Sequence, residues 1–250
     1  GLGASVYAPS KYGLITESVP PRLLVRANAW LEVSVVLSVI LGIALGGALT
    51  GLTEAGFNTQ LMSSWTPVTA LAVTTQTWPA MALIVGVYLV AALLNLGLKP
   101  MGQGVQLVPL SLHAMKVTTF WKSNRKLWRD PLGGVSLYVT TLYWGVGAVM
   151  QFAVLVWAQQ SLGMTLKFSA YLQALVAIGV IVGAYMAGRS FKLHSARQAL
   201  PWGLLLAVLL PVMVMVSELW IAIPLLLCVG VAGGMLLVPM NALLQHRGMQ

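Results

Sequence analysis

Side chains able to support acid–base, nucleophilic or metal chemistry are few in this sequence and lie far apart. The one aspartate is Asp130, the one cysteine is Cys228, and the histidines are His113, His194 and His246. None of the three histidines has a carboxylate within five residues, whereas a catalytic base needs an acid or nucleophile close by. A single cysteine excludes an internal disulfide or a thiolate cluster. We therefore expect no enzyme, no catalytic residues, no metal centre and no cofactor.

The composition is typical of a membrane protein. Hydrophobic residues make up 58% of the 250 residues and charged residues only 8%, whereas soluble domains carry about 25% charged residues. The formal net charge of +9 would indicate a nucleic-acid partner in a soluble protein. Here its meaning depends on where the basic residues lie. We predict an all-α polytopic membrane protein.

Six segments are long and apolar enough to cross a bilayer as helices, which requires about 20 residues. They are Ala29–Leu52, Pro79–Leu98, Gly134–Gln159, Ser169–Gly188, Leu200–Val216 and Leu219–Met240. Residues 1–8 resemble the end of a further span, and the chain lacks an initiator methionine. We therefore interpret the sequence as an internal part of a longer protein.

The basic residues orient these spans. All of the 14 lysines and arginines except Lys167 lie in alternate loops, and hence on one side of the membrane. By the positive-inside rule that side is the cytoplasm. Residues 1–28 are then the end of a truncated span plus a cytoplasmic loop, 29–98 hold two spans joined by a periplasmic loop (53–78), and 134–250 hold four spans. Because topology explains the positive charge, we expect no nucleic-acid partner.

Residues 99–133 form a long, basic cytoplasmic linker between the second and third spans. Within it, 111–129 alternates apolar and basic residues in a way that predicts an amphipathic helix on the membrane surface. An irregular, solvated linker is the alternative. In either case, membrane lipids are expected partners of these cations.

Glu32 is the one acid inside a predicted span, where an ionisable group indicates a functional site. Asn28 lies four residues earlier, so both side chains share one helix face. We expect this face to line a cavity in which Glu32 acts as a gate or ion-pair partner. Alternatively, Glu32 is interfacial and pairs with Arg26 or contacts water. Further amides in apolar runs could bind a ligand or join helices by hydrogen bonds: Gln151, Gln159, Gln173 and Asn241.

Two pairs of glycines predict close helix packing. Gly42 and Gly46 lie four residues apart in the first span, and Gly179 and Gly183 have the same spacing in the fourth. Small residues at this spacing allow helix backbones to approach each other.

Five stretches along the chain carry recognisable motifs. They are Tyr7–Gly13 (YAPSKYG), Ala27–Glu32 (ANAWLE), Leu142–Gly147 (LYWGVG), Ala177–Ala184 (AIGVIVGA) and Val238–Gly248 (VPMNALLQHRG). In this order they resemble the bacterial lysophospholipid transporters of the major facilitator superfamily. The resemblance implies a superfamily-like helical bundle, of which this chain holds the end of helix four to helix ten of twelve. Helices five and eight would carry the glycine pairs and slide against each other during alternating access.

The resemblance also implies a function. Such a carrier moves lysophospholipid, chiefly lysophosphatidylethanolamine, across the bacterial inner membrane toward the cytoplasm, where an acyltransferase partner re-acylates it. Lys11 is the expected phosphate partner, although a lysine snorkelling to the membrane surface would look the same. Trp144 could line the acyl path or simply pack between helices. The family has a basic residue in helix seven where this chain has Gln151, so only a hydrogen-bonding role remains there.

Other functions agree less well with the sequence. Another carrier of the superfamily, such as a drug or metabolite exporter, is the main alternative. Proton-coupled carriers usually place titratable groups inside their spans, and here only Glu32 qualifies, which favours an amphipathic lipid as cargo. A membrane enzyme lacks the required acid–base pairs, and a purely structural subunit leaves the polar residues in the spans unexplained.

Overall fold

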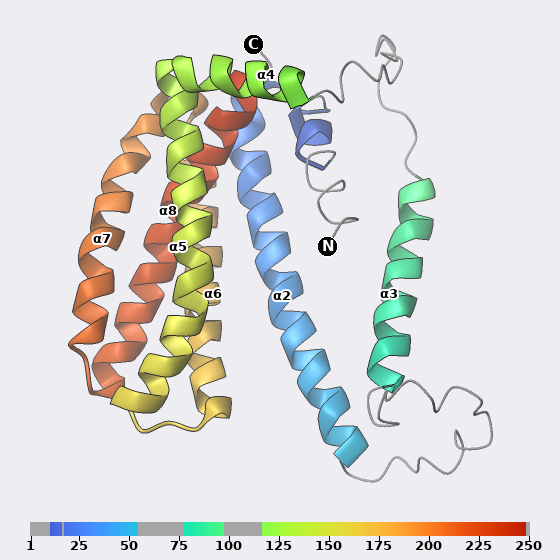
Figure 1. Ribbon diagram of the computed structural model, residues 1–250, viewed down its shortest axis with the longest axis vertical. Coiled ribbons are helices and arrows are strands. Elements are labelled where there is room, and N and C mark those ends of the chain that lie inside the picture. Colours follow the sequence, from blue (N-terminus) through green and yellow to red (C-terminus); the bar gives the residue numbers. More distant parts are fainter. Residues whose placement is uncertain (1–10, 17, 55–77, 98–116, 249–250) are drawn as a thin grey trace. The chain divides into compact units, whose positions relative to one another are not determined.

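The computed structural model describes residues 11–16, 18–54, 78–97 and 117–248, and every regular element in these residues is helical. Residues 11–16 form a short helical segment. The elements that follow are η1 (Pro21–Leu23), α2 (Leu24–Glu54), α3 (Trp78–Leu96), α4 (Val117–Arg129), α5 (Pro131–Ser161), α6 (Leu166–Ser190), η4 (Leu193–Ala199), α7 (Leu200–Val214) and α8 (Leu219–Gly248), as Figure 1 shows. The predicted all-α class is confirmed.

The chain divides into two compact units. The first comprises residues 1–37 and 107–250, and the second comprises residues 38–106. The first unit therefore contains the beginning of α2 together with α4 to α8, whereas the second contains the rest of α2 and α3. The residues that could form a functional site lie in the first unit.

The predicted spans correspond to helices of the structure. Among the residues that the structure describes, five helices are long and apolar enough to cross a membrane, and the apolar part of α3, Met81–Leu96, is shorter. The ends differ from the prediction: α2 begins at Leu24 rather than Ala29, and α8 continues from Met240 to Gly248. Hydropathy falls where polar residues begin, but the helical hydrogen bonds of the backbone continue through them. The predicted truncated span (1–8) and most of the periplasmic loop lie outside the described residues.

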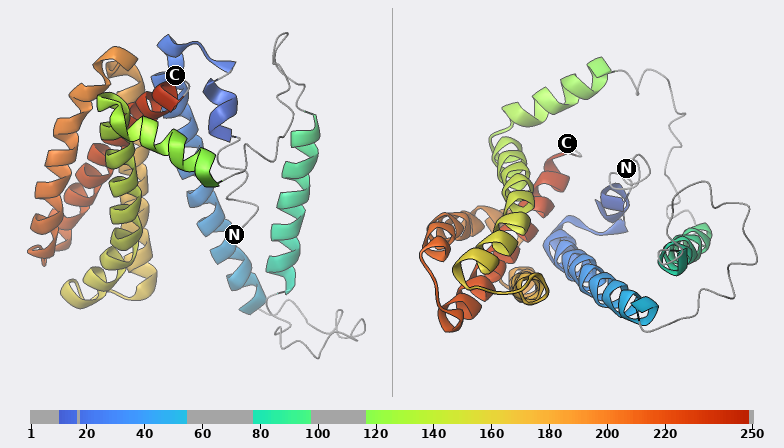
Figure 2. Two further views of the ribbon diagram at one scale, coloured as in Figure 1. Left: turned by 45° about the horizontal axis from the view of Figure 1, so that its top comes forward. Right: turned by 60° about the horizontal axis from the view of Figure 1, so that its bottom comes forward.

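α8 is the central helix of the first unit. It packs against α5, α6, α7 and η4, and its most extensive contact is with α6. Figure 2 shows α5, α6 and α7 arranged around it. The middle of α8 is almost fully buried, from Ala232 through Met240. This burial explains why α8 is apolar on all sides, as expected for a helix surrounded by others.

Glycines bring α6 and α8 into backbone contact. Gly179 and Gly183 of α6 face α8, and an added Cβ at Gly183 would overlap the carbonyl oxygen of Val231. On α8, an added Cβ at Gly234 would lie 2.5 Å from the backbone nitrogen of Ala184. Small residues at a spacing of four thus allow two membrane helices to approach closely.

The structure shows one partner of the α6 glycine face. Gly179 and Gly183 both contact the backbone of α8. An added Cβ at Gly42 would meet open space, and the surroundings of Gly46 are outside the described side chains. The α6 glycines therefore pack against α8 in this structure, and a sliding surface during alternating access stays a prediction.

Asp130 joins the start of α5 to the end of α8. Its Oδ2 accepts a hydrogen bond of 2.7 Å from the backbone N–H of Gly133, which caps α5, and Pro131 occupies the first helical turn. The same Oδ2 lies 3.6 Å from Nε of Arg247 on α8. An aspartate at an N-cap satisfies a free backbone donor and favours the helix dipole. The one aspartate of the chain therefore has a structural role.

α4 immediately precedes Asp130 and turns away from the direction of α5 (Figure 1). The predicted amphipathic segment is helical over Val117–Arg129, and residues 111–116 lie outside the described part. Trp121 and Trp128 are exposed and share one face by their spacing of seven, while Lys122 and Lys126, four residues apart, project from another. The helix therefore has the amphipathic character predicted for it.

Candidate functional site

The candidate site lies near one end of the first unit, where α2, α5 and α7 begin and α6 and α8 end (Figure 1). We call this end the basic end, because the arginines and lysines of the unit gather there. They include Arg22, Arg26, Arg189, Lys192, Arg197 and Arg247. By the positive-inside rule this end is predicted to be cytoplasmic.

A pair of amide side chains connects α2 to α8 at the basic end. Nδ2 of Asn28 donates to Oε1 of Gln245 at 2.8 Å, and Nε2 of Gln245 donates back to Oδ1 of Asn28 at 2.8 Å. Nδ2 of Asn28 also donates to the carbonyl of Leu24 at 2.9 Å. Asn28 is only 2% exposed, and a buried amide is costly unless it is hydrogen-bonded. The reciprocal pair satisfies it and fixes α2 against α8.

Apolar side chains near the amide pair form a buried cluster between α2, α6 and α8 at the basic end. Leu24, Val25, Ala29 and Val33 of α2 form one buried cluster with residues of α6 and α8. The partners are Ala184, Ala187, Met235, Val238 and Ala242. An added Cβ at Gly188 of α6 would lie only 2.6 Å from Cβ of Ala29. Gly188, which the sequence analysis missed, therefore allows α2 to approach α6; the run of small residues around it is the signal that could have identified it.

Glu32 lies one turn after Asn28 and is 6% exposed. Lys11, Tyr12 and Tyr143 are within electrostatic reach of its carboxyl group. Glu32 is thus buried, with Lys11 as a nearby cation, and its role as a gate or ion-pair partner stays a prediction. The structure gathers one acid, one cation and two phenols from three separate segments of the chain, which we call the Glu32 cluster.

Lys11 and Tyr12 come from the short helical segment before α2. Both are partly buried, and Nζ of Lys11 lies 6.0 Å from the centroid of the Tyr12 ring, at the outer range of a cation–π contact. Burial raises the pKa of the Tyr12 hydroxyl, and the nearby Glu32 carboxylate raises it further. Tyr12 therefore remains a protonated hydrogen-bond donor at neutral pH.

Tyr143, rather than Trp144, is the aromatic residue beside Glu32. An added Cβ at Gly233 of α8 would lie 2.8 Å from the Tyr143 hydroxyl, so the phenol sits against the bare backbone of α8. Trp144 contacts Tyr143 edge-on, with ring centroids 6.1 Å apart, and is 52% exposed. The sequence alone does not distinguish these two adjacent aromatic residues. The rotation of α5 about its own axis decides which of the two side chains faces α8.

The remaining amides have separate positions. The side chain of Gln173 on α6 donates to the backbone carbonyl of Gln151 on α5, which is the interhelical bond considered for such residues. The side chain of Gln151 itself is exposed, as is that of Gln159, while Asn241 is partly buried one turn before Gln245. Ligand-binding roles for Gln151 and Asn241 stay predictions. In the described ranges of the chain, no three His, Cys, Asp or Glu side chains gather as a metal ion would require.

The amide pair supports a first prediction. Asn28→Ala or Gln245→Ala leaves a buried amide without its partner, which should lower the free energy of unfolding by about 1–3 kcal/mol. In the double variant the loss should be smaller than the sum, with a coupling of about 1 kcal/mol or more. Unfolding of the purified protein in detergent measures this, with Gln159→Ala on the exposed side of α5 as control. Strictly additive losses would show that the two amides do not stabilise each other.

The membrane-length helices of the described residues define a polytopic membrane protein. The family comparison is specific: the chain belongs to the Major Facilitator Superfamily, whose model matches residues 1–248. Members of this family are transporters, which confirms the prediction that the chain is not an enzyme.

Individual relatives extend this result. The chain is 32% identical over 249 residues to the lysophospholipid transporter LplT of Serratia proteamaculans (strain 568), covering 99% of this chain and 56% of the relative. The LplT proteins of Shigella flexneri (32%, 57% of the relative) and Yersinia pestis (strain Pestoides F; 31%, 55%) match over the same 99% of this chain. The chain therefore spans about half the length of these curated relatives, and the family resemblance seen in the sequence is confirmed. No solved structure matches the chain.

Proposed function

We propose that this chain is part of a carrier that moves lysophospholipid, chiefly lysophosphatidylethanolamine, across the bacterial inner membrane toward the cytoplasm. The main support is the 32% identity to a lysophospholipid transporter over 99% of the chain. An acyltransferase that re-acylates the delivered lipid is the expected partner in the cytoplasm.

The Glu32 cluster offers the charges that such a head group needs. The head group of lysophosphatidylethanolamine carries a phosphate and an ammonium, and the cluster carries Lys11 and Glu32 within electrostatic reach of each other. Lys11 binds the phosphate with Tyr12 as a second donor, while Glu32 attracts the ammonium. Without lipid, Lys11 and Glu32 attract each other, so that neither charge is left unpaired in the low-dielectric interior.

The amide pair and its apolar surroundings act as the cytoplasmic gate. In alternating access the two halves of a transporter of this superfamily rock around a central site. α2 belongs to one half, and α6 and α8 belong to the other. Release of lipid to the cytoplasm therefore breaks the Asn28–Gln245 bonds and separates Ala29 from Gly188.

Uptake of labelled lysophosphatidylethanolamine tests the proposal. Spheroplasts that express the full-length protein should accumulate the lipid saturably, well above cells with empty vector. A monoacylglycerol of the same chain length is the matched control, because it lacks the phosphate that Lys11 binds and should not be accumulated. Absence of lipid uptake together with transport of an unrelated solute would assign the protein to another kind of carrier in the superfamily.

A further inference from the structure

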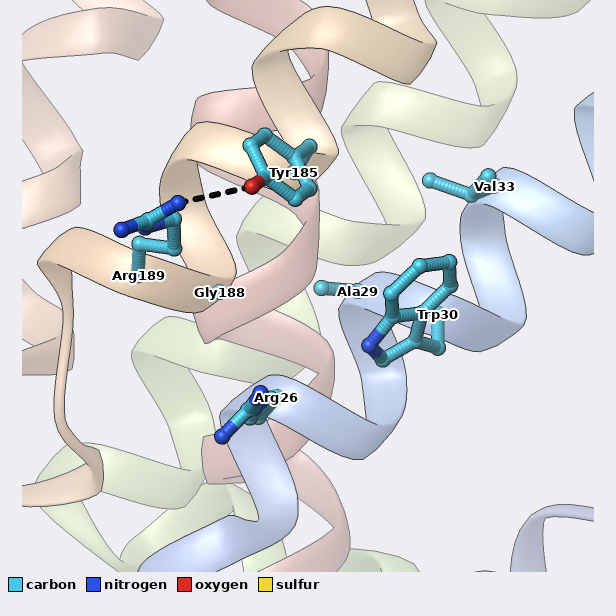
Figure 3. A pocket seen from close by; sticks show the side chains of 7 residues that line it. All are labelled: Arg26, Ala29, Trp30, Val33, Tyr185, Gly188 and Arg189. Carbon is cyan, nitrogen blue, oxygen red and sulfur yellow. Dashed lines mark hydrogen bonds between the residues drawn. The ribbon is translucent and has the colours of Figure 1, made fainter.

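A recess lies at the basic end, between α2 and α6. Its volume is about 450 Å³, and it is lined by Arg26, Ala29, Trp30, Val33, Tyr185, Gly188 and Arg189 (Figure 3). Since a helix turns about 100° per residue, Arg26, Trp30 and Val33 project from the side of α2 roughly opposite to Asn28 and Glu32. The recess is therefore separate from the Glu32 cluster. We call it the arginine groove.

The two walls of the arginine groove carry the same order of side chains. On α2 the spacing of four, three and four residues places one stripe on a single face: Arg26, Trp30, Val33 and Leu37. On α6 the same spacing occurs in reverse: Arg189, Tyr185, Val182 and Ile178. The helices run in opposite directions, since α2 begins and α6 ends at the basic end (Figure 1). Both stripes thus lead from an arginine through an aromatic ring to aliphatic side chains.

The aromatic rings and the outer aliphatic side chains of both stripes are exposed in the described part of the chain, whereas Val33 is buried in the cluster with α6 and α8. The exposed fractions are 56% for Trp30, 45% for Leu37 and 44% for both Val182 and Ile178. Exposed aliphatic surface on a membrane helix contacts lipid chains, and exposed aromatic rings are best placed at the head-group level. Each stripe therefore matches the order of polarity of one phospholipid molecule, from the head group to the acyl chains.

The groove also presents oriented hydrogen-bond donors to an anion. Nη1 of Arg189 donates to the Tyr185 hydroxyl at 2.7 Å, and its guanidinium lies 5.6 Å from the centroid of the same ring. This contact orients the guanidinium and leaves further N–H donors for a ligand. Arg26 lines the same recess from α2, and none of the lining residues is acidic. Two guanidinium groups around one recess repel each other unless an anion lies between them.

We propose that the arginine groove binds an anionic diacyl phospholipid of the cytoplasmic leaflet. The phosphate lies between Arg26 and Arg189, whose forked donors suit phosphate oxygens. The glycerol region lies beside Trp30 and Tyr185, and one acyl chain follows each aliphatic stripe. Basic recesses between membrane helices on the cytoplasmic side are suited to such head groups. A lipid held by both arginines stabilises the contact between α2 and α6 without being transported.

Lipid binding to the purified full-length protein tests this assignment. The probe is phosphatidylglycerol in neutral detergent, with phosphatidylcholine of the same chains as comparison, and bound lipid is counted by native mass spectrometry. The unmodified protein should prefer phosphatidylglycerol by about tenfold or more, and Arg26→Gln with Arg189→Gln should remove that preference. Arg22→Gln, which removes a cation at the same end but outside the groove, should leave the preference unchanged. Arg26→Lys and Arg189→Lys keep the positive charge but lose the two parallel N–H donors of the guanidinium. These variants should lose part of the preference for phosphatidylglycerol.

Three outcomes would overturn the assignment. In the first, the double glutamine variant retains the preference for phosphatidylglycerol, so that the groove is not the binding site. In the second, inorganic phosphate displaces the lipid at equal concentration, so that the acyl chains contribute nothing. In the third, lysophosphatidylethanolamine displaces it equally well, so that the groove belongs to the transport path. Failure of lysolipid uptake would leave all three measurements interpretable, because they need only the folded protein.

Discussion

Lys11→Ala should reduce uptake of lysophosphatidylethanolamine by about 10- to 100-fold, because a hydrogen bond to a charged group contributes about 1.5–3 kcal/mol. The variant loses the phosphate partner and also leaves the buried carboxyl group of Glu32 without its cation. Glu32→Gln should impair uptake to a similar degree, since it removes the partner of the ammonium. The double variant should be little worse than either single one, because both residues act as one unit.

Spheroplast uptake, normalised to the amount of protein in the membrane, checks this prediction. Lys122→Ala is the matched control, because it removes a lysine from the exposed surface of α4 and should leave uptake within about twofold. Unchanged uptake in both the Lys11 and the Glu32 variants would exclude the Glu32 cluster from the lipid path. Additive losses would indicate that the two charges act independently of each other.

Gly183→Ala should cause the largest loss of stability among glycine-to-alanine substitutions in the described helices. The added methyl group would overlap the backbone carbonyl of Val231, and a backbone atom cannot rotate away as a side chain can. Overpacking of this kind costs about 1–3 kcal/mol, and Gly183→Leu should exceed that range and abolish folding. Elsewhere in a helix, alanine in place of glycine should stabilise by about 0.5–1 kcal/mol.

The matched control is Gly145→Ala on α5, where an added Cβ meets nothing within 4 Å. We expect the control to be neutral or slightly stabilised, so that the two substitutions differ in sign. The fraction of monomeric protein that survives heating in detergent measures the difference. Equal survival of the two variants would mean that α6 and α8 separate easily, contrary to the close contact described here.

The helices could largely be predicted from the sequence, because each span is a continuous apolar run. Their ends could not be. Hydropathy decreases at Asn241, but α8 continues to Gly248, since Gln245 finds a partner on α2 and Arg247 one at the start of α5. Polar residues that are satisfied by distant partners extend a helix beyond its apolar run, and a window along the sequence does not contain those partners.

The candidate site was predicted only in part. The shared face of Asn28 and Glu32 follows from their spacing, and so do the paired glycines of α6. Gln245 lies 217 residues from Asn28, and no local pattern connects residues so far apart. Gly230 and Gly234 carry the same spacing as Gly179 and Gly183 and could have identified α8 as the partner of α6. Tyr143 could not be distinguished from Trp144 without knowing the rotation of α5.

The central position of α8 has a consequence for biogenesis. α2, α5, α6 and α7 all leave the ribosome before α8, although each uses α8 as a partner. Until α8 has been synthesised, the nascent chain holds the amide of Asn28 and the glycine face of α6 without their final contacts. These earlier helices therefore acquire their packed partners only after α8 has been inserted.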